Sequence, residues 1–316
     1  MNSDIRLLQI EPTFTDAVLR TPLKFGSGVV AAITSCTVRA LVETRDGKRG
    51  EGLGHILLSD LWGFPSQVVG HEQRDAAMRE VTRRFCAHML DNARFGHPME
   101  LYLEAKPVLH DLAAAVSADQ HLAEAMPILG ALVCAAPVDA ALTDAFGRAN
   151  GLCSYDAYGP AFMNQDLSAW CGPRFAGKYP ADYLHDSYKP TLPIFHLVGG
   201  LDKQILAEVT DSDPQDGLPV SLEEWIERDG LRCFKVKLRG NDNDWDVERT
   251  AAVAEVIAAT YARLGINSKY YLSTDSNEMN PNPESVVDYL HRLEERSPAA
   301  YEALLYLEQP TERDLS

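Results

Sequence analysis

Three short polar motifs have side chains that could do chemistry together, and each lies in or after an apolar run. They contain Lys235 and Lys237 in CFKVKL, Asp275 in KYYLSTDSN, and Glu308 in ALLYLEQP. Asp275 and Glu308 offer hard oxygen ligands, which suit Mg²⁺ because this ion is often bound by only one or two protein carboxylates. Two lysines opposite a carboxylate-bound Mg²⁺ would form an arrangement that removes a proton from a carbon next to a carboxylate.

The two lysines are two residues apart on a predicted strand. Strand periodicity places Lys235 and Lys237 on one face, with Phe234, Val236 and Leu238 on the other. Their mutual repulsion is expected to lower the pKa of both, and a nearby divalent cation would lower it further. A lysine tuned in this way can act as a general base near neutral pH. Alone, however, the pattern is more typical of an exposed edge strand with solvated lysines.

The two acidic motifs also have simpler interpretations. An Asp-Ser-Asn turn usually only ends a strand, and Glu308 could be an idle residue at an exposed rim. The three motifs nevertheless follow one another on successive predicted strands, with a helix between each pair. This order favours one shared site formed by Lys235, Lys237, Asp275 and Glu308, which the side chain of Asn277 could support from nearby.

Strands and helices alternate through the C-terminal part of the chain. TLPIFHLVG at 191–199 is a predicted strand, Ser221 and Glu224 form a capping box, and Asn282-Pro283 begins a helix. This alternation implies parallel strands with right-handed crossovers. In a (β/α) barrel, active sites form at the C-terminal ends of the strands, where the polar motifs lie.

The N-terminal part has a different pattern. The first ~55 residues predict an antiparallel meander, with apolar alternation from Cys36 to Val42 and an Asp-Gly turn at 46–47. Residues 67–150 are helical in pattern, as the spacing of Val81, Phe85 and Met89 indicates. Residues 151–190 are rich in turn formers and aromatic residues, which predicts a long loop or insertion.

Composition narrows the class of protein. The 316 residues carry 29 Lys and Arg against 46 Asp and Glu, a formal net charge of −17, which disfavours nucleic acid and anionic membranes as partners. No window is expected to approach the ~20 apolar residues of a membrane span, and the N-terminus lacks the apolar core of a signal peptide. Six scattered cysteines without a CxxC pair are typical of reduced thiols. We therefore predict a cytoplasmic protein.

These motifs resemble those of the enolase superfamily, in its mandelate racemase and muconate lactonizing enzyme branch. FKVKL resembles the lysine strand of the family. DSN resembles the segment that carries the family's first metal aspartate, and LEQP resembles the one that carries its second metal ligand. APVDAALTDAFGRANGLCSYDAYG at 136–159 resembles the linking helix. Arg20-Thr21-Pro22-Leu23 and the turn DGKRGEG resemble parts of the capping domain, so the resemblance covers most of the chain.

The resemblance implies an α/β fold of two domains. An N-terminal α+β capping domain would span residues 1–133, and a (β/α) TIM-type barrel would begin in 134–316, with the aromatic-rich insertion at 151–190. A barrel takes roughly 250 residues. We therefore expect an incomplete barrel in this 316-residue chain, with the third metal ligand and the second acid or base beyond Ser316.

The resemblance also implies a role for each site residue. Lys237 would be the general base, Lys235 would contact the substrate carboxylate, and Asp275 and Glu308 would hold Mg²⁺. Asn277 and His55 are predicted to contact the substrate. Two segments, 26–31 and 52–55, would be loops that close over it.

Several functions stay open at this point. A Mg²⁺-dependent lyase or isomerase acting on a small-molecule carboxylate is the leading prediction, as an acid-sugar dehydratase or racemase first and a cycloisomerase or epimerase second. A Schiff-base aldolase with Lys237 as the nucleophile is one alternative, and a catalytically silent structural relative is another. We also expect a homo-oligomer.

Overall fold

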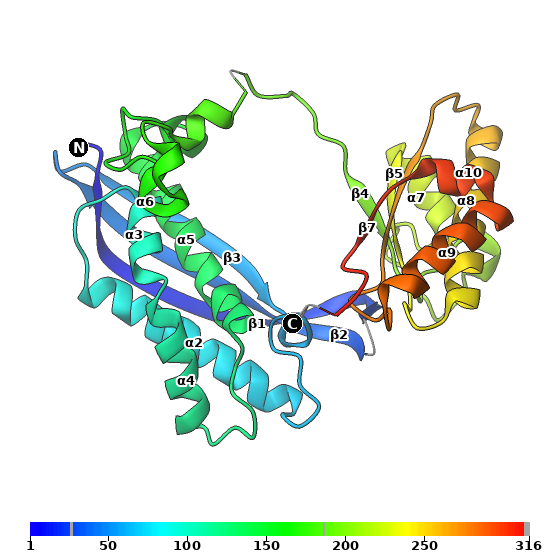
Figure 1. Cartoon of the computed structure of the whole chain (residues 1–316), viewed down its shortest axis with the longest axis horizontal. Coiled ribbons are helices and arrows are strands. Elements are labelled where there is room, and N and C mark those ends of the chain that lie inside the picture. Colours follow the sequence, from blue (N-terminus) through cyan, green and yellow to red (C-terminus); the bar gives the residue numbers. More distant parts are fainter. Residues whose placement is uncertain (26–27, 186, 313–316) are drawn as a thin grey trace. The chain divides into compact units, whose positions relative to one another are not determined.

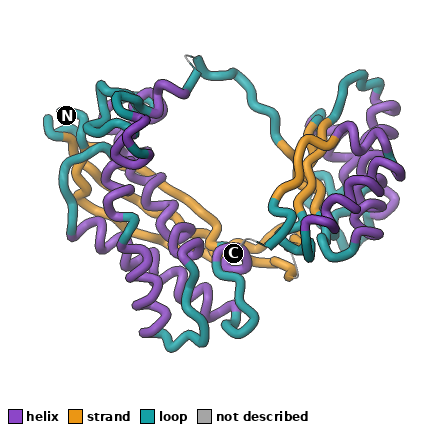
Figure 2. Tube along the Cα trace, viewed as in Figure 1, coloured by secondary structure: helices purple, strands orange, loops and turns teal. Residues whose placement is uncertain are grey.

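The chain folds into two compact units, each with its own sheet. The computed structural model describes residues 1–25, 28–185 and 187–312. The first unit comprises Met1–Val18 and Ala32–Tyr188, and the second comprises Leu19–Ala31 and Lys189–Ser316. Figure 1 follows the chain through both units, and Figure 2 shows their helices and strands.

The first unit contains the antiparallel meander that the sequence predicted. Its three strands lie side by side in chain order: β1 (Ile5–Phe25), β2 (Gly28–Thr44) and β3 (Arg49–Leu58). β2 and β3 pair antiparallel across the Asp-Gly turn, where Gly47 adopts a φ of +84°. Every second side chain from Cys36 to Val42 is fully buried, which confirms the predicted alternation.

Four longer helices of the first unit follow the meander. They are α2 (His71–Asp91), α3 (Pro98–Ala105), α4 (Val108–Asp119) and α5 (Ile128–Asn150), after the single turn α1 (Asp60–Gly63). Val81, Phe85 and Met89 are buried in α2, as their spacing predicted. The domain boundary predicted after residue 133 falls inside α5, and contacts group residues 134–188 with the first unit.

Helix α5 lies directly on the backbone of β3. A Cβ on Gly52 would be 2.2 Å from the backbone nitrogen of Ala145, and one on Gly54 would be 1.9 Å from the carbonyl oxygen of Pro137. Only glycine permits so close a contact at these two positions. The prediction of a loop at 52–55 is therefore wrong, because these residues form part of β3. Of the other predicted loop, Gly26 and Ser27 lie outside the described residues, and the rest begins β2.

The expectation that no segment approaches the length and composition of a membrane span is wrong for helix α5. By length and composition its 23 residues could cross a membrane, and its most apolar 18-residue window is 56% buried inside the structure. Ala141, Leu142 and Ala145 on this helix are fully buried in the core of the first unit. These contacts identify α5 as a core helix of this unit.

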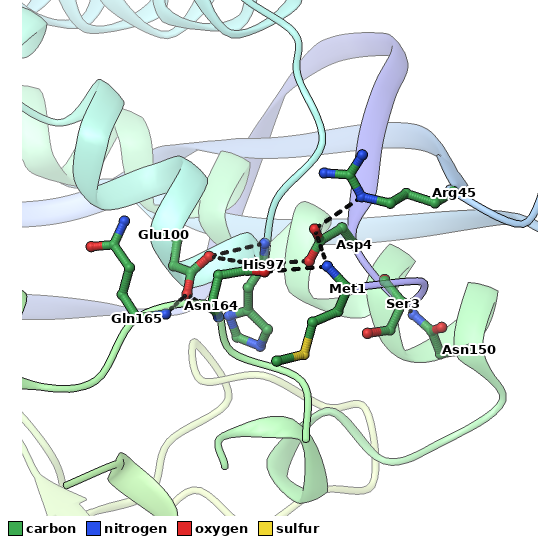
Figure 3. Close-up of polar contacts among 9 residues, drawn as sticks. All are labelled: Met1, Ser3, Asp4, Arg45, His97, Glu100, Asn150, Asn164 and Gln165. Atoms are coloured by element: carbon green, nitrogen blue, oxygen red, sulfur yellow. Dashed lines mark hydrogen bonds and ion pairs between the residues drawn. The ribbon is translucent and has the colours of Figure 1, made fainter. Parts of the chain in front are cut away.

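Residues 151–188 form short turns, as predicted for the insertion. They contain η1 (Ser154–Ala157), α6 (Ser168–Cys171), η2 (Pro173–Phe175) and η3 (Pro180–Tyr183). Figure 3 shows how polar contacts attach this segment to Asp4, just before β1, and to Glu100 of α3. The amide nitrogen Nδ2 of Asn164 donates to Asp4 and to Glu100, at 2.9 Å each, and the backbone N–H groups of Asn164 and Gln165 donate to Glu100 at 2.7 and 2.8 Å. We refer to Asp4, Glu100 and Asn164 as the N-terminal clasp.

The second unit contains a parallel sheet whose strands also lie in chain order. They are β4 (Phe195–Val198), β5 (Cys233–Lys237), β6 (Tyr271–Asp275) and β7 (Leu304–Glu308). The connections contain η4 (Leu206–Glu208), α7 (Leu222–Asp229), α8 (Asn243–Leu264), α9 (Pro283–Arg296) and α10 (Pro298–Ala303). This confirms the predicted alternation, including the capping box of Ser221 and Glu224.

The two faces of the parallel sheet differ in chemistry. Its helices lie along one face in Figure 2, and Phe234, Val236 and Leu272 are fully buried in the core there. Because strand side chains alternate, Lys235 and Lys237 lie on the opposite face, as predicted. The chain thus combines an antiparallel N-terminal sheet with a parallel sheet, and the α/β fold class is confirmed.

Candidate active site at the strand ends

The ends of β5, β6 and β7 bring the predicted site residues together. In the strand register, Lys237 pairs with Asp275, and Asp275 pairs with Glu308. The three residues therefore form a row across neighbouring strand termini, although 71 positions of sequence separate the first from the last. We refer to Lys235, Lys237, Asp275 and Glu308 as the strand-end cluster.

Both lysines of the cluster contact the same carboxylate oxygen. Nζ of Lys235 lies 2.9 Å from Oδ2 of Asp275 and donates to Oε2 of Glu308 at 2.7 Å. Nζ of Lys237 donates to the same Oδ2 of Asp275, and also to Oδ1 of Asn277 at 3.1 Å. The backbone N–H of Asn277 donates to the second oxygen of Asp275 at 2.9 Å. Asn277 therefore supports the cluster from the adjacent turn.

Burial and pairing set the charge states of these groups. Burial raises the pKa of Asp275, but hydrogen bonds from the two lysines outweigh it and hold the pKa below its ordinary value. Burial lowers the pKa of Lys237, and Asp275 offsets this only in part, so the net pKa is lowered. This is the direction that a general base requires.

The pKa of Lys235 is not lowered, although we predicted that the pKa values of both lysines would fall. Burial lowers its pKa, but the hydrogen bonds that Lys235 donates to Glu308 and Asp275 outweigh this, so its pKa is raised. Lys235 has two carboxylate partners, and 22% of its side chain is exposed, against 8% for Lys237. The prediction is therefore wrong for Lys235, and the two lysines are electrostatically distinct.

The donor set of the cluster fits a hard divalent cation. Asp275 and Glu308 supply carboxylate oxygens from adjacent strands, and Asp275 is only 1% exposed. Oxygen donors of this kind, with few protein ligands, are typical of Mg²⁺ sites. Within residues 1–25, 28–185 and 187–312, no group of three or more His, Cys, Asp or Glu side chains could hold a metal. The described chain thus offers two acidic ligands at this position.

His55 lies on β3 in the first unit. Its side chain is exposed, and Nε2 lies 2.8 Å from Oγ of Ser35 on the neighbouring strand. The described contacts of His55 are those of a residue on a strand surface. Its predicted role in substrate binding stays a prediction.

A cavity of about 510 Å³ in the second unit is separate from the cluster. Its lining includes His196, Trp225, Lys203 and Arg20. His196 pairs in register with Phe234, which faces the helices, so His196 lies on the opposite side of the sheet from Lys235. None of the four residues of the strand-end cluster lines this cavity, although Leu197, which pairs in register with Lys235, does.

Ser276 is the residue that the sequence analysis overlooked. It lies between Asp275 and Asn277 and is fully buried, and its hydroxyl faces carbonyl groups of the loop after β7. Its place inside the DSN motif was a local signal of importance. Its partners are 33 and 34 residues away, so no local pattern could identify them.

Comparison with known proteins finds solved structures whose fold is similar to that of this chain. No protein-family model matches the chain, and no curated protein matches it. A dipeptide epimerase from Enterococcus faecalis V583, solved with Mg and the dipeptide L-Leu-L-Tyr, is similar in structure with a TM-score of 0.54 and 15% identity, over 98% of this chain and 62% of that one. An enolase from Bradyrhizobium, solved with magnesium and mandelic acid, gives 0.52 and 14%, over 99% and 63%.

A third similar structure belongs to the same group of enzymes. The mandelate racemase/muconate lactonizing protein from Herpetosiphon aurantiacus gives a TM-score of 0.50 and 16% identity, over 99% of this chain and 63% of that one. The chain spans about three fifths of the length of these structures. Its fold is therefore similar to that of these enolase-superfamily structures, as its motifs predicted.

Proposed function

We propose that the protein is a Mg²⁺-dependent lyase or isomerase that removes a proton from the carbon next to a substrate carboxylate. The strand-end cluster supports this proposal most strongly, because two lysines and two carboxylates meet at the C-terminal ends of barrel strands. The use of a Lys base with Mg²⁺ is a documented pattern of the enolase superfamily.

Lys237 acts as the general base. Its Nζ, when neutral, accepts the α-proton, and the electrons of the broken C–H bond move into the substrate carboxylate to give an enediolate. Burial favours the neutral amine, since it lowers the pKa of Lys237. Asp275 and Asn277 orient the amine through their hydrogen bonds to it.

Lys235 stabilises the negative charge that proton removal creates. Its pKa is raised, so it stays an ammonium group at neutral pH and can bind the substrate carboxylate. Asp275 and Glu308 would hold Mg²⁺, and the bound ion supplies positive charge to the enediolate. Preorganised positive charge of this kind is usually the largest contribution to catalysis.

The type of reaction is the finer part of the proposal. The names of the similar structures, a dipeptide epimerase and a mandelate racemase/muconate lactonizing protein, favour racemase, epimerase or cycloisomerase chemistry. They give no particular support to the acid-sugar dehydratase that we predicted first. We further propose a cytoplasmic protein that acts as a homo-oligomer on a small-molecule carboxylate, as the resemblance implies.

Proton exchange tests this function directly. The protein is incubated in D₂O with MgCl₂ and either L-Leu-L-Tyr or mandelate, and loss of the α-proton signal is followed by ¹H NMR. We expect exchange that EDTA abolishes. Absence of exchange with these and other α-substituted carboxylates, together with absence of Mg²⁺ binding in calorimetry, would contradict the proposal.

Two observations favour other functions. The lowered pKa of Lys237 also suits a Schiff-base aldolase, which borohydride trapping of a carbonyl substrate on Lys237 would support and EDTA-sensitive exchange would exclude. The presence of only two acidic ligands in the described chain suits a catalytically silent relative. Mg²⁺ binding that depends on Asp275 and Glu308 but supports no exchange would favour that second alternative.

A further inference from the structure

The loops that follow β6 and β7 are hydrogen-bonded to each other. Oγ of Ser276 lies 3.4 Å from the carbonyl oxygen of Gln309 and 3.2 Å from that of Pro310. The N–H of Glu278 donates to the Gln309 carbonyl at 2.7 Å, and the N–H of Asn280 donates to the Pro310 carbonyl at 3.1 Å. We refer to these contacts as the loop brace.

The backbone in the loop brace is strained. Asn277, Glu278 and Gln309 have φ angles of 51°, 67° and 45°, in the left-handed region that favours glycine. This conformation is unfavourable for residues other than glycine, and it persists only where the surroundings hold it. Two of these residues are joined directly by the bond from Glu278 to Gln309. The brace therefore maintains a backbone geometry that an isolated loop would not adopt.

A third loop packs against the brace. Gly240, after β5, has a φ of +76°, and a Cβ there would lie 2.9 Å from the backbone nitrogen of Asn280 and 2.9 Å from the carbonyl carbon of Met279. The loops after β5 and β6 are therefore in close backbone contact. The termini of all three strands that carry the strand-end cluster are held by neighbouring loops.

The loop brace joins the residues that directly follow the two carboxylates. Asp275 precedes Ser276, and Glu308 precedes Gln309. The Ser276 hydroxyl donates to two carbonyl groups of the loop after β7, and neither carbonyl belongs to the strand-end cluster. A change at Ser276 would thus act on the spacing of Asp275 and Glu308 and leave their own chemistry intact.

We propose that Ser276 is a positioning residue that sets the separation of the Asp275 and Glu308 carboxylates and so selects Mg²⁺ over larger cations. This inference rests on the proposed function, because it assumes that the two carboxylates bind the metal. Mg²⁺ requires near-octahedral ligands at about 2.0–2.1 Å, whereas Ca²⁺ accepts flexible geometry at about 2.3–2.6 Å. A looser pair of carboxylates should therefore lose Mg²⁺ affinity before it loses Ca²⁺ affinity.

Calorimetric titration of the full chain with MgCl₂ and with CaCl₂ tests the inference. In Ser276→Ala we expect Kd for Mg²⁺ to rise about tenfold, at the low end of the range for groups that orient metal ligands, because the hydroxyl contacts are long. Kd for Ca²⁺ should change less than about threefold. Ser221→Ala is the matched control, since Ser221 is also a fully buried serine of the second unit, at the start of α7. It should leave both constants unchanged.

The outcomes separate this inference from the proposed function. Equal weakening of both ions, or no change in either, overturns the role of Ser276 while Mg²⁺ binding by the unaltered chain stands. Failure of the unaltered chain to bind Mg²⁺ overturns both proposals. Amide hydrogen exchange tests the loop brace in the absence of metal. The Glu278 and Asn280 amides should exchange faster in Ser276→Ala and not in Ser221→Ala. Unchanged exchange at both amides would show that Ser276 does not maintain the brace.

Discussion

The N-terminal clasp and the strand-end cluster both bury carboxylates, but they satisfy them with different partners. In the clasp, Glu100 is 4% exposed and accepts from the backbone N–H groups of His97, Asn164 and Gln165 and from the neutral side-chain amide of Asn164. The other clasp carboxylate, Asp4, pairs with the N-terminal ammonium group of Met1 and with Arg45. In the cluster, Asp275 is 1% exposed and accepts from the ammonium groups of Lys235 and Lys237.

The difference between the donors of Glu100 and those of Asp275 leads us to expect a structural role for the first and a reactive role for the second. Backbone donors are fixed by the fold, so Glu100 is held in one arrangement and anchors Asn164 and Gln165. Lysine side chains are mobile and charged, and a buried ion pair is weak evidence for stability because desolvation offsets the attraction. We therefore expect the charged groups of the cluster to contribute little to folding stability, and the proposed function requires that they exchange partners with a cation and a substrate.

Loss of Lys237 should have the largest effect on activity. We expect Lys237→Met to lower the rate of α-proton exchange by about 1000-fold, within the usual range for removal of a general acid or base. Mg²⁺ binding should persist, because Asp275 and Glu308 remain. Lys203→Met is a suitable control, since Lys203 contacts Asp213 away from the cluster. Exchange at the original rate in Lys237→Met would exclude Lys237 as the base.

Loss of charge at Asp275 should mainly affect the metal. In Asp275→Asn the side chain can still hydrogen-bond, but it no longer offers a carboxylate, and we expect Kd for Mg²⁺ to rise at least about 100-fold. Asp4→Asn in the clasp is the matched control and should leave Kd unchanged. If both variants bind Mg²⁺ alike, the chemical distinction between the two clusters is wrong.

Removal of a carboxylate should lower stability more in the clasp than in the cluster, the reverse of its expected effect on Mg²⁺ binding. Glu100→Ala removes the acceptor of the backbone N–H groups of His97, Asn164 and Gln165, and we expect a loss of about 2 kcal/mol in the free energy of unfolding. Glu308→Ala should cost less than about 1 kcal/mol, because the Glu308 side chain is 36% exposed and its ion pair with Lys235 is partly solvated. Urea denaturation measures both values, and a larger loss in Glu308→Ala would reverse the comparison.

A third buried carboxylate, Asp246, combines features of both regions. It accepts from the backbone N–H groups of Arg239 and Gly240, at 2.7 and 2.8 Å, in the loop after β5. Burial raises its pKa to about 6, and the two backbone hydrogen bonds only partly offset this. The native state therefore binds this proton more tightly than the unfolded state does. Stability from this group is complete below about pH 4 and falls as pH rises to about 6.

The pH dependence of stability tests the raised pKa of Asp246. Relative to Asp246→Asn, the unaltered protein should lose about 2 kcal/mol of unfolding free energy between pH 4 and pH 7. Urea denaturation at four pH values in this window measures the difference between the two proteins. A constant difference across the window would mean that Asp246 titrates normally.

Local patterns in the sequence determined much of the second unit. Period-two alternation predicted that Lys235 and Lys237 share a face, and capping residues such as Ser221 predicted where a helix begins. Both signals depend on residues a few positions apart, so they can be recognised in the sequence without a structure. Chain order and the rule of parallel crossovers then predicted that Asp275 and Glu308 would be neighbours.

Contacts between distant residues were decided only by the tertiary structure. The raised pKa of Lys235 depends on Glu308, which is 73 residues away, and the strand geometry of Gly52 and Gly54 depends on the backbone of α5. The role of Ser276 likewise depends on a loop more than 30 residues further along. Periodicity specifies which way a side chain faces on its own element, whereas charge state and close packing depend on what another element places opposite it.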